Sequence, residues 1–179
     1  MTACTAPLAL AHLDTPLGEM IAAASETHLH LLEFAHRRML DTQLERVRRT
    51  TGCELVEGES PVISKVHSQL AALFRGERLE LDVPFIARGT PFQERVWAAL
   101  RTIPVGTTTS YARVAIAVGQ PTATRAVARA NGDNRLAILI PCHRVIGSDG
   151  SLTGYGGGLW RKKRLLELEA RVHILSLNL

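Results

Sequence analysis

The chain is organised around Ile140-Pro141-Cys142-His143-Arg144-Val145, where an apolar run leads into a reactive side chain. Proline fixes its own φ and favours an extended residue before it, so Cys142 follows a stiff stem. A thiol is an effective nucleophile only as its thiolate, and with an unperturbed pKa of about 8.5 it is mostly protonated at neutral pH. A nearby base or positive charge has to raise the thiolate fraction, and His143 and Arg144 are the nearest candidates. A lone Cys-His pair is more often a buried thiol beside a structural histidine, so the rest of the chain has to decide.

Length and composition describe a globular protein. The chain has 179 residues, of which 46% are hydrophobic and 21% charged, enough for one domain or two small ones. No apolar run reaches the ~18 residues of a membrane span, and no basic region precedes apolar residues 9–11, so we expect no signal peptide. Cys4, Cys53 and Cys142 are odd in number and lack CxxC spacing. This argues against a disulfide framework or a zinc cluster and suits a reducing compartment.

The charge is unevenly distributed between the two halves of the chain. Residues 1–88 contain 9 Lys/Arg and 12 Asp/Glu, a net charge of −3. Residues 89–179 contain 12 Lys/Arg and 5 Asp/Glu, a net charge of +7. A basic half beside an acidic one suggests a polyanionic partner for the basic half, although a +7 domain can also be simply solvated.

The first half is predicted to be a small α/β domain. Alternation and turn residues predict strands at residues 8–13, 20–24, 29–34, 54–56 and 79–83. Apolar spacing predicts helices at 39–49 and from Pro61 to Gly76, the second capped by Ser60. His28, His30 and His36 lie on or just after a predicted strand without a matching cysteine or carboxylate pattern, so we expect no metal site there. Residues 85–89 are the predicted link to the second half.

The second half is predicted to be mainly helical. The capping box Thr90-Pro91-Phe92-Gln93 begins a helix that runs to about residue 103. Two short helices follow, 111–118 capped by Ser110 and 123–130 capped by Thr122, with a glycine-containing turn between them. This arrangement is typical of a helix-turn-helix. The prediction also includes a turn at 131–134, the Cys142 stretch, loops at 148–151 and 153–158, and a last helix at 160–170.

The helix at 123–130 has the character of a nucleic-acid contact. Arg125 and Arg129 are four residues apart and share a face, flanked by the small side chains of Ala123, Ala126 and Ala130. Small residues let a helix backbone approach a ligand closely, and arginines beside them suit phosphates or a base stack. A tight helix–helix contact with two solvated arginines is the alternative, and the charge distribution favours nucleic acid.

The second half resembles the O6-alkylguanine-DNA alkyltransferase family. The matching motifs, in order, are Gly89-Thr90-Pro91-Phe92-Gln93, Ser110-Tyr111, Arg125-Ala126-Val127, Asn131-Gly132, residues 141–146 and Gly154-Tyr155. They cover nearly all of residues 89–179, and the turn Thr15-Pro16-Leu17-Gly18 extends the match weakly into the first half. The resemblance implies an α+β fold: a structural, ribonuclease-H-like α/β domain at 1–88, then a mainly helical DNA-binding and alkyl-acceptor domain with a helix-turn-helix at 89–179.

The resemblance also implies the chemistry. Such a protein repairs DNA by flipping an alkylated guanine out of the duplex and moving the alkyl group onto its own cysteine, once and irreversibly. Cys142 falls on the nucleophile, His143 on the base that activates it through a water, and Glu169 on the carboxylate that orients the histidine. Tyr111 falls on the tyrosine that donates a proton toward the departing base, because a neutral guanine is the better leaving group. Asn134 falls on an asparagine that braces the active-site turn.

By the same resemblance, other residues bind the base and the DNA. Tyr111, Val145, Tyr155 and Gly156 would line the base pocket, the last three through their backbone groups. Arg125 would fill the gap left in the base stack. The other residues expected to bind DNA are Tyr111, Gln120, Ala126 and Ser148.

The sequence also departs from the family in places. Arg135 follows Asn134 where proline is frequent, and Arg164 stands where tryptophan is frequent. Some family members bind structural zinc in the first domain. Cys4 matches one ligand, but the second cysteine is absent, so we expect neither zinc nor any cofactor. The expected partner is double-stranded DNA carrying O6-alkylguanine, and we expect no association with a membrane. We expect the protein to act as a monomer, in the cytoplasm near the nucleoid or, in a eukaryote, in the nucleus.

Two other classes of function are alternatives to the alkyl acceptor. A cysteine hydrolase would form a thioester and release it with water, which requires an oxyanion hole and repeated turnover. A DNA-binding sensor would be alkylated at Cys142 only as a signal, but such proteins usually carry a regulatory domain, and nothing in the sequence resembles one. Activity on O4-alkylated thymine and the largest accepted alkyl group are left open.

Overall fold

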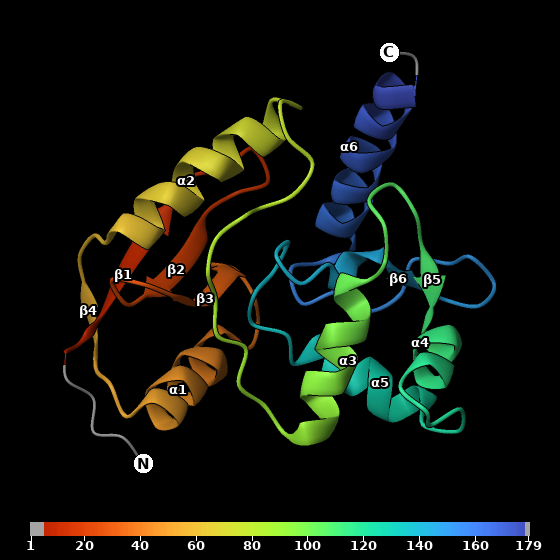
Figure 1. The fold of residues 1–179 in the computed structure, drawn as a ribbon, viewed down its shortest axis with the longest axis horizontal. Helices are drawn as coiled ribbons and strands as arrows, with labels where there is room; N and C mark the ends of the chain where they lie inside the picture. Colours follow the sequence, from red (N-terminus) through yellow and green to blue (C-terminus); the bar gives the residue numbers. More distant parts are fainter. Residues whose placement is uncertain (1–5, 178–179) are drawn as a thin grey trace. The chain divides into compact units, whose positions relative to one another are not determined.

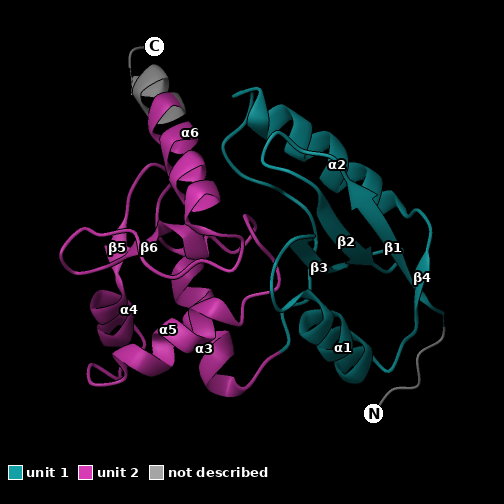
Figure 2. Ribbon diagram, turned by 180° about the vertical axis from the view of Figure 1, so that it is seen from behind, with its two compact units in different colours: residues 1–88 teal, residues 89–179 magenta. Residues whose placement is uncertain are grey.

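The computed structural model describes residues 6–177, and the side chains of residues 6–171. The chain divides into two compact units, residues 1–88 and residues 89–179 (Figure 2). None of the helices within residues 6–177 combines the length and the apolar character that crossing a membrane requires.

The first unit contains a four-stranded mixed sheet (Figure 1). The strands are β1 (Leu8–Leu13), β2 (Met20–Ala24), β3 (Leu29–Phe34) and β4 (Leu55–Glu57), in the order β3-β2-β1-β4. β2 pairs antiparallel with both β1 and β3, whereas β4 runs parallel to β1. The turn before β2 is fixed by Thr15, whose hydroxyl donates to the Gly18 carbonyl at 2.6 Å, and Gly18 has a φ of 97° that glycine adopts without strain.

Helices α1 (Leu40–Thr51) and α2 (Pro61–Phe74) cover opposite faces of this sheet (Figure 1). Val47 of α1 belongs to one core cluster with Leu8, Ile21, Ala23 and Leu31. α2 begins as predicted, because the Ser60 hydroxyl accepts the Ile63 N–H at 3.2 Å and Pro61 occupies the first turn. Its apolar stripe is buried, which the helical spacing in the sequence predicted.

The strand predicted at 79–83 is wrong. Within the first unit this segment has no strand pairing, and the chain makes only an isolated bridge between Phe85 and Leu29. A side chain takes the place of the missing strand: the Asp82 N–H donates to Gln69 Oε1 at 2.7 Å, and Gln69 Nε2 donates to the Asp82 carbonyl at 3.0 Å. The alternating pattern therefore reflects a segment held by one glutamine amide rather than by a ladder.

The second unit is mainly helical. Its elements are α3 (Pro91–Arg101), β5 (Thr109–Ser110), α4 (Tyr111–Ala117), α5 (Thr124–Gly132), the 3₁₀ turn η1 (Cys142–Arg144), β6 (Val145–Ile146) and α6 (Leu159–Leu177). β5 and β6 pair in parallel, Thr109 with Val145 and Ser110 with Ile146. Because α4 follows β5 directly and β6 follows η1 directly, this short pairing brings the start of α4 beside the Cys142 turn.

Helix α3 fixes the position of α5. The predicted capping box is present, with Gln93 N–H donating to the Thr90 hydroxyl at 3.3 Å and the Thr90 N–H donating to Gln93 Oε1 at 2.9 Å. Trp97 of α3 donates from Nε1 to the Ala130 carbonyl of α5 at 2.9 Å. A Cβ at Gly89 would lie 2.7 Å from the Trp97 ring, so only glycine fits there.

Three details of the helical predictions are wrong. Ala123, not Thr122, occupies the N-cap of α5 and makes no side-chain cap, because Ala123 N–H instead closes a turn onto the Gln120 carbonyl. α5 extends to Gly132 and so includes residues predicted as a turn, while α6 extends to Leu177. Ala130 is buried under Trp97 rather than exposed beside the arginines. The mixed α+β class itself is confirmed.

Candidate active site

Cys142 opens the η1 turn and is only 6% exposed. The turn is tight: the Cys142 N–H donates to the Ile140 carbonyl at 2.7 Å, and the Arg144 N–H donates to the Pro141 carbonyl at 3.0 Å. The approach to it is strained, since Ile138 has a φ of 70°, which a β-branched residue rarely adopts. Contacts around the turn must therefore hold Ile138 in this conformation, and with it the chain that leads to the thiol.

Asn134 holds the turn and contacts the sulfur. Its amide Nδ2 donates to the Ile140 carbonyl at 3.0 Å and to Cys142 Sγ at 3.2 Å, and its Oδ1 accepts the Leu136 N–H at 3.0 Å. An N–H aimed at sulfur stabilises the thiolate more than the thiol. The structure thus places Asn134 at the turn that the sequence expected it to brace, and adds a direct contact to the Cys142 sulfur.

Asn131 links the same turn to α5. From the last turn of that helix, Asn131 Nδ2 donates to the Cys142 carbonyl at 3.4 Å. Together with Asn134, two residues beyond the helix end, it joins the cysteine to the helix that carries Arg125. The position of the sulfur and the orientation of α5 are therefore connected by hydrogen bonds.

His143 and Arg144 converge on one carboxylate. His143 is fully buried and its Nε2 lies 2.7 Å from Glu169 Oε1. Arg144 Nη2 donates to the same oxygen at 2.9 Å, and its Nε lies 3.1 Å from both Glu169 oxygens. Arg144 Nη1 donates to the Ile103 carbonyl at 2.6 Å, so the guanidinium is fixed from a second side. The Gly106 N–H adds a contact to Glu169 Oε2 at 3.3 Å.

These partners keep Glu169 ionised. Burial alone would raise the pKa of its carboxyl, but the hydrogen bond and charge of His143 and the guanidinium of Arg144 outweigh burial and lower that pKa to about 2. An ionised carboxylate only accepts hydrogen bonds, so His143 Nε2 must carry the proton. In the neutral ring Nδ1 is then the basic nitrogen, and it is buried without a hydrogen-bond partner within the described residues.

Tyr111 and Lys162 meet at the next loop. The Tyr111 hydroxyl donates to the carbonyls of Thr153 and Gly154 at 3.2 and 3.3 Å. Lys162 Nζ donates to the same carbonyls at 2.6 and 3.4 Å, and also to the Val145 carbonyl at 2.6 Å. Its ammonium lies 6.0 Å from the centre of the Tyr111 ring. The phenol and the ammonium therefore share one edge of the space beside the cysteine.

Both groups respond to the charge of the thiolate. Burial lowers the pKa of Lys162 to about 8, while the negative charge of Cys142 acts in the opposite direction. Burial raises the pKa of Tyr111, the hydrogen bond to Thr153 opposes this, and the Cys142 charge raises it further. Since such interactions are mutual, the Lys162 ammonium favours the thiolate form of Cys142.

Four of the remaining predicted residues lie at the surface of the second unit. Arg125 and Ala126 are exposed on α5, Gln120 is exposed in the turn before it, and Ser148 is exposed in the loop after β6. Tyr155 and Gly156 follow the two carbonyls that Tyr111 and Lys162 share.

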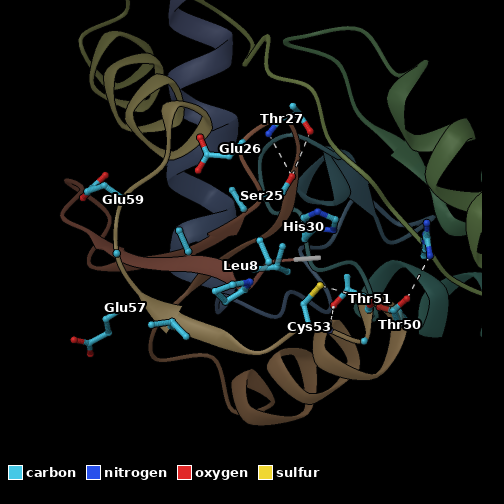
Figure 3. A pocket seen from close by; sticks show the side chains of 18 of the residues that line it. Leu8, Ser25, Glu26, Thr27, His30, Thr50, Thr51, Cys53, Glu57 and Glu59 are labelled. Carbon is cyan, nitrogen blue, oxygen red and sulfur yellow. Dashed lines mark hydrogen bonds between the residues drawn. The ribbon is translucent and has the colours of Figure 1, made fainter. Parts of the chain in front are cut away.

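The first unit contains a separate cavity. It measures about 860 Å³ and is lined by residues that include Leu8, Ser25, His30, Cys53 and Glu57 (Figure 3). Cys53 is disulfide-bonded, contrary to the expectation from cysteine number and spacing; the Cys4 position lies outside the described residues. Within residues 6–177 the structure gathers no group of three His, Cys, Asp or Glu side chains that could hold a metal. None of the predicted site residues lines this cavity.

The prediction from sequence did not include Lys162 as a site residue or Arg144 as a partner of Glu169. Lys162 is fully buried although it lies among exposed charges at the start of α6. A usable signal exists, because Lys162, Leu165 and Glu169 follow i, i+3, i+7 spacing and so share the buried stripe of the helix. Arg144 was considered only as a positive neighbour of the thiol, not as the anchor of a carboxylate 25 residues away.

Comparison with known proteins agrees with this geometry. Residues 91–171 match the family model described as 6-O-methylguanine DNA methyltransferase, DNA binding domain. The methylated-DNA–protein-cysteine methyltransferase of Mycolicibacterium paratuberculosis is 46% identical over 168 residues, 93% of this chain and 95% of that protein. The constitutive enzyme of the same name from Bacillus subtilis is 42% identical, over 86% of this chain and 89% of its own.

Solved structures agree across both units. The structure of Mycobacterium tuberculosis OGT in complex with DNA matches with a TM-score of 0.76 and 43% identity, over 90% of this chain and 92% of that one. The family resemblance found in the sequence is confirmed, and the chain belongs to the methylated-DNA–protein-cysteine methyltransferase family.

Proposed function

We propose that this protein repairs DNA by transferring an alkyl group from O6 of guanine in duplex DNA to Cys142, in a single irreversible turnover. Family membership supports the reaction, and the Cys142 environment supports the acceptor. The observation that carries the assignment is the buried sulfur that accepts a hydrogen bond from Asn134 and lies next to the His143–Glu169–Arg144 chain.

The transfer is a displacement at carbon. His143 Nδ1 takes the thiol proton through one water, the sulfur forms a bond to the alkyl carbon, and the bond between that carbon and O6 breaks. Its electron pair stays on the base, which leaves neutral once it gains a proton. Glu169 holds the histidine in the tautomer that can accept the proton, and its ion pair with Arg144 prevents it from taking the proton itself.

Tyr111 supplies the proton to the base. Its hydroxyl is already oriented by the Thr153 and Gly154 carbonyls, and Lys162 places a positive charge beside the phenolate that proton donation leaves. Solvent later returns the proton to Tyr111. Apart from the water between Cys142 and His143, the groups that act on the reacting atoms are side chains of this protein, and the proposed reaction requires no cofactor.

The DNA would be bound through the surface of the second unit. We propose that α4 and α5 form a helix-turn-helix, a reading supported by two short helices joined by a turn at Gly119, whose φ is 74°. Arg125, exposed on α5 beside Ala126, would fill the stack after the base is extruded, with Gln120 and Ser148 on the DNA backbone. Backbone groups of Val145, Tyr155 and Gly156 would line the base pocket together with Tyr111.

We propose a structural role and a ribonuclease-H-like fold for residues 1–88. The strand order β3-β2-β1-β4, with β4 parallel to β1 after the crossover through α1, supports that fold. Every residue assigned to the chemistry comes from the second unit of one chain, which supports action as a monomer. The substrate, chromosomal DNA, would place the protein in the cytoplasm of a bacterium, at the nucleoid, or in the nucleus of a eukaryote.

The test is the intact mass of the protein after mixing with duplex DNA containing O6-methylguanine. Replacement of one thiol hydrogen by a methyl group, located at Cys142 by peptide mapping, is the expected result. Cys142→Ser should bind the duplex and gain no mass, because a serine hydroxyl is far harder to ionise than a thiol. A methyl group on another residue would refute the acceptor assignment, and unmodified protein with repeated turnover on an ester would favour a cysteine hydrolase. A sensor alkylated at Cys142 would gain the same mass, so its methylated form would have to be tested separately for a signalling role in DNA binding.

A further inference from the structure

A glycine-rich segment begins at one of the two carbonyls that Tyr111 and Lys162 share, and it has little structure of its own. Residues 154–158 read Gly-Tyr-Gly-Gly-Gly, and Gly154 and Gly158 have φ values of 48° and 91°. One turn hydrogen bond closes it, from the Gly158 N–H to the Tyr155 carbonyl at 3.0 Å. Glycine loses more backbone freedom on ordering than any other residue. A single conformation of this segment therefore depends on contacts from outside it.

Two adjacent cations at the start of α6 supply those contacts. Lys162 holds the beginning of the segment through the Thr153 and Gly154 carbonyls. Arg161 holds its other end, with Nη1 donating to the Gly157 carbonyl at 2.8 Å. Both side chains are buried, Lys162 at 0% and Arg161 at 8% exposed. The two side chains thus hold the segment on either side of Tyr155 and Gly156, and the Lys162 N–H adds a bond to the Gly158 carbonyl at 3.2 Å.

Trp160 covers the second fixing point. The Arg161 guanidinium carbon lies 4.4 Å from the centre of the Trp160 ring, although Trp160 itself is 53% exposed. A guanidinium over a tryptophan face is attracted to it, more so when water is kept from one side. The stack also limits the rotation of Arg161, so its hydrogen bond to Gly157 is held in one direction.

The segment begins beside Tyr111, at the start of α4, which the β5–β6 pairing brings next to the Cys142 turn. A Cβ on Gly154 would lie 3.3 Å from the Tyr111 hydroxyl, and both Tyr111 and Lys162 respond to the charge of Cys142. The space between the sulfur and this segment is where a group leaving a base for Cys142 has to fit. Whatever fixes the segment therefore limits the size of that group.

From this arrangement we propose that Arg161, stacked on Trp160, determines the alkyl-group specificity of the protein by fixing the Gly157 end of the pocket wall. The proposal rests on the proposed function, because it concerns the group transferred to Cys142. A fixed wall favours the small methyl group, since its backbone groups are already placed for the base. A larger group needs the wall to move, and the Arg161–Gly157 hydrogen bond opposes that movement. Arg161 acts as a positioning residue that contacts the wall and not the reacting atoms.

The experiment compares two substrates in one duplex sequence, O6-methylguanine and O6-benzylguanine, by the rate constant of transfer to the full chain. In Arg161→Ala the benzyl-to-methyl rate ratio should rise about tenfold, as expected from losing one hydrogen bond and one cation–π contact. Trp160→Ala should give a smaller rise, and Trp160→Phe should restore most of the wild-type ratio. Lys163→Ala is the matched control, because Lys163 is exposed on the same turn and pairs with Glu167 on α6; it should leave the ratio unchanged.

A merely structural role predicts something different. If Arg161→Ala slows both substrates equally, or leaves both rates unchanged, the proposal is refuted. Should Arg161→Ala fail to fold, Trp160→Ala and Arg161→Lys decide the matter, and an unaltered ratio in both would refute it. Absence of transfer in the wild-type protein would refute the proposed function, whereas a wild-type transfer with an insensitive ratio refutes only the role of Arg161.

Discussion

Tyr111 Oη and Lys162 Nζ donate hydrogen bonds to the same two carbonyl oxygens, those of Thr153 and Gly154. A phenol that gives its proton to a departing base becomes an anion, and the nearest buried cation then stabilises it. The same cation favours the thiolate of Cys142. In the proposed transfer, Lys162 thus stabilises both the attacking thiolate of Cys142 and the phenolate that forms on Tyr111.

Lys162→Met should therefore slow transfer on the order of a hundredfold, the usual cost of removing one preorganised electrostatic contact. The pKa of Lys162 is lowered to about 8, so the wild-type rate should fall as pH rises through that value and the ammonium loses its proton. Stopped-flow transfer rates from pH 6 to 10 would show this decline in wild type and not in the variant. An identical alkaline decline in both proteins would mean that another group titrates there. Lys163→Met, which changes an exposed charge, is the control.

Glu169→Gln should slow transfer without abolishing it and should remove a pH-dependent part of stability. The folded-state pKa of about 2 lies below the ordinary 4.5, so the stabilisation is complete above pH 4.5 and is lost as pH falls toward 2. The shift corresponds to roughly 3 kcal/mol of unfolding free energy. Urea unfolding at pH 7, 4 and 3 should show a wild-type advantage that shrinks with acidity. A difference that stays constant with pH would contradict this role, and Glu167→Gln, on the half-exposed side of α6, should change little.

Arg125→Ala should slow repair of duplex DNA by roughly tenfold or more, because extruding a base costs a few kcal/mol that the guanidinium no longer offsets. Reaction with the free base O6-benzylguanine needs no extrusion and should proceed at the wild-type rate. Arg129→Ala offers a matched comparison on the same exposed face of α5. It should weaken DNA binding in all sequences and reduce the slope of log affinity against log salt by about 1. If Arg125→Ala slows the free base as much as the duplex, the residue has a role inside the pocket instead.

Alkylation of Cys142 should lower the stability of the protein. The sulfur is buried and accepts a hydrogen bond from Asn134, so a thioether both adds volume and loses acceptor strength. Overpacking of a buried site typically costs ~1–3 kcal/mol. For a chain of this size each kcal/mol shifts the melting temperature by roughly 2–4 °C. Thermal melts of unmodified, methylated and benzylated protein should therefore fall in that order. A constant or rising midpoint would show that the pocket accepts the group without strain.

The sequence predicted local structure well where apolar runs end in turn residues. The strands expected at 20–24 and 29–34 have the observed bounds, and the caps at Ser60, Thr90 and Ser110 are formed as expected. Residues 79–83 misled the prediction, because an alternating pattern does not reveal that the hydrogen-bonding partner of Asp82 is the side chain of Gln69.

The candidate site was predicted in part. The family resemblance suggested the roles of Cys142, His143, Glu169, Tyr111 and Asn134. The structure pairs Asn134 with Cys142 and Glu169 with His143, the residue next to Cys142 in the chain. Composition and spacing do not indicate that Arg144 binds the same carboxylate as His143, because that contact is made across 25 residues of chain. Lys162 was overlooked because a lysine among exposed charges is usually solvated, and only its helical phase with Leu165 marks it as buried.

The burial of Lys162 has a practical consequence for chemical labelling. The sequence contains three lysines, and of these Lys65 and Lys163 are exposed while Lys162 is enclosed. An amine-reactive reagent should modify the two exposed lysines at once and reach Lys162 only in molecules whose pocket wall has opened. The extent of labelling at Lys162, read by peptide mass, thus measures the opening of this wall in the native protein without any substitution.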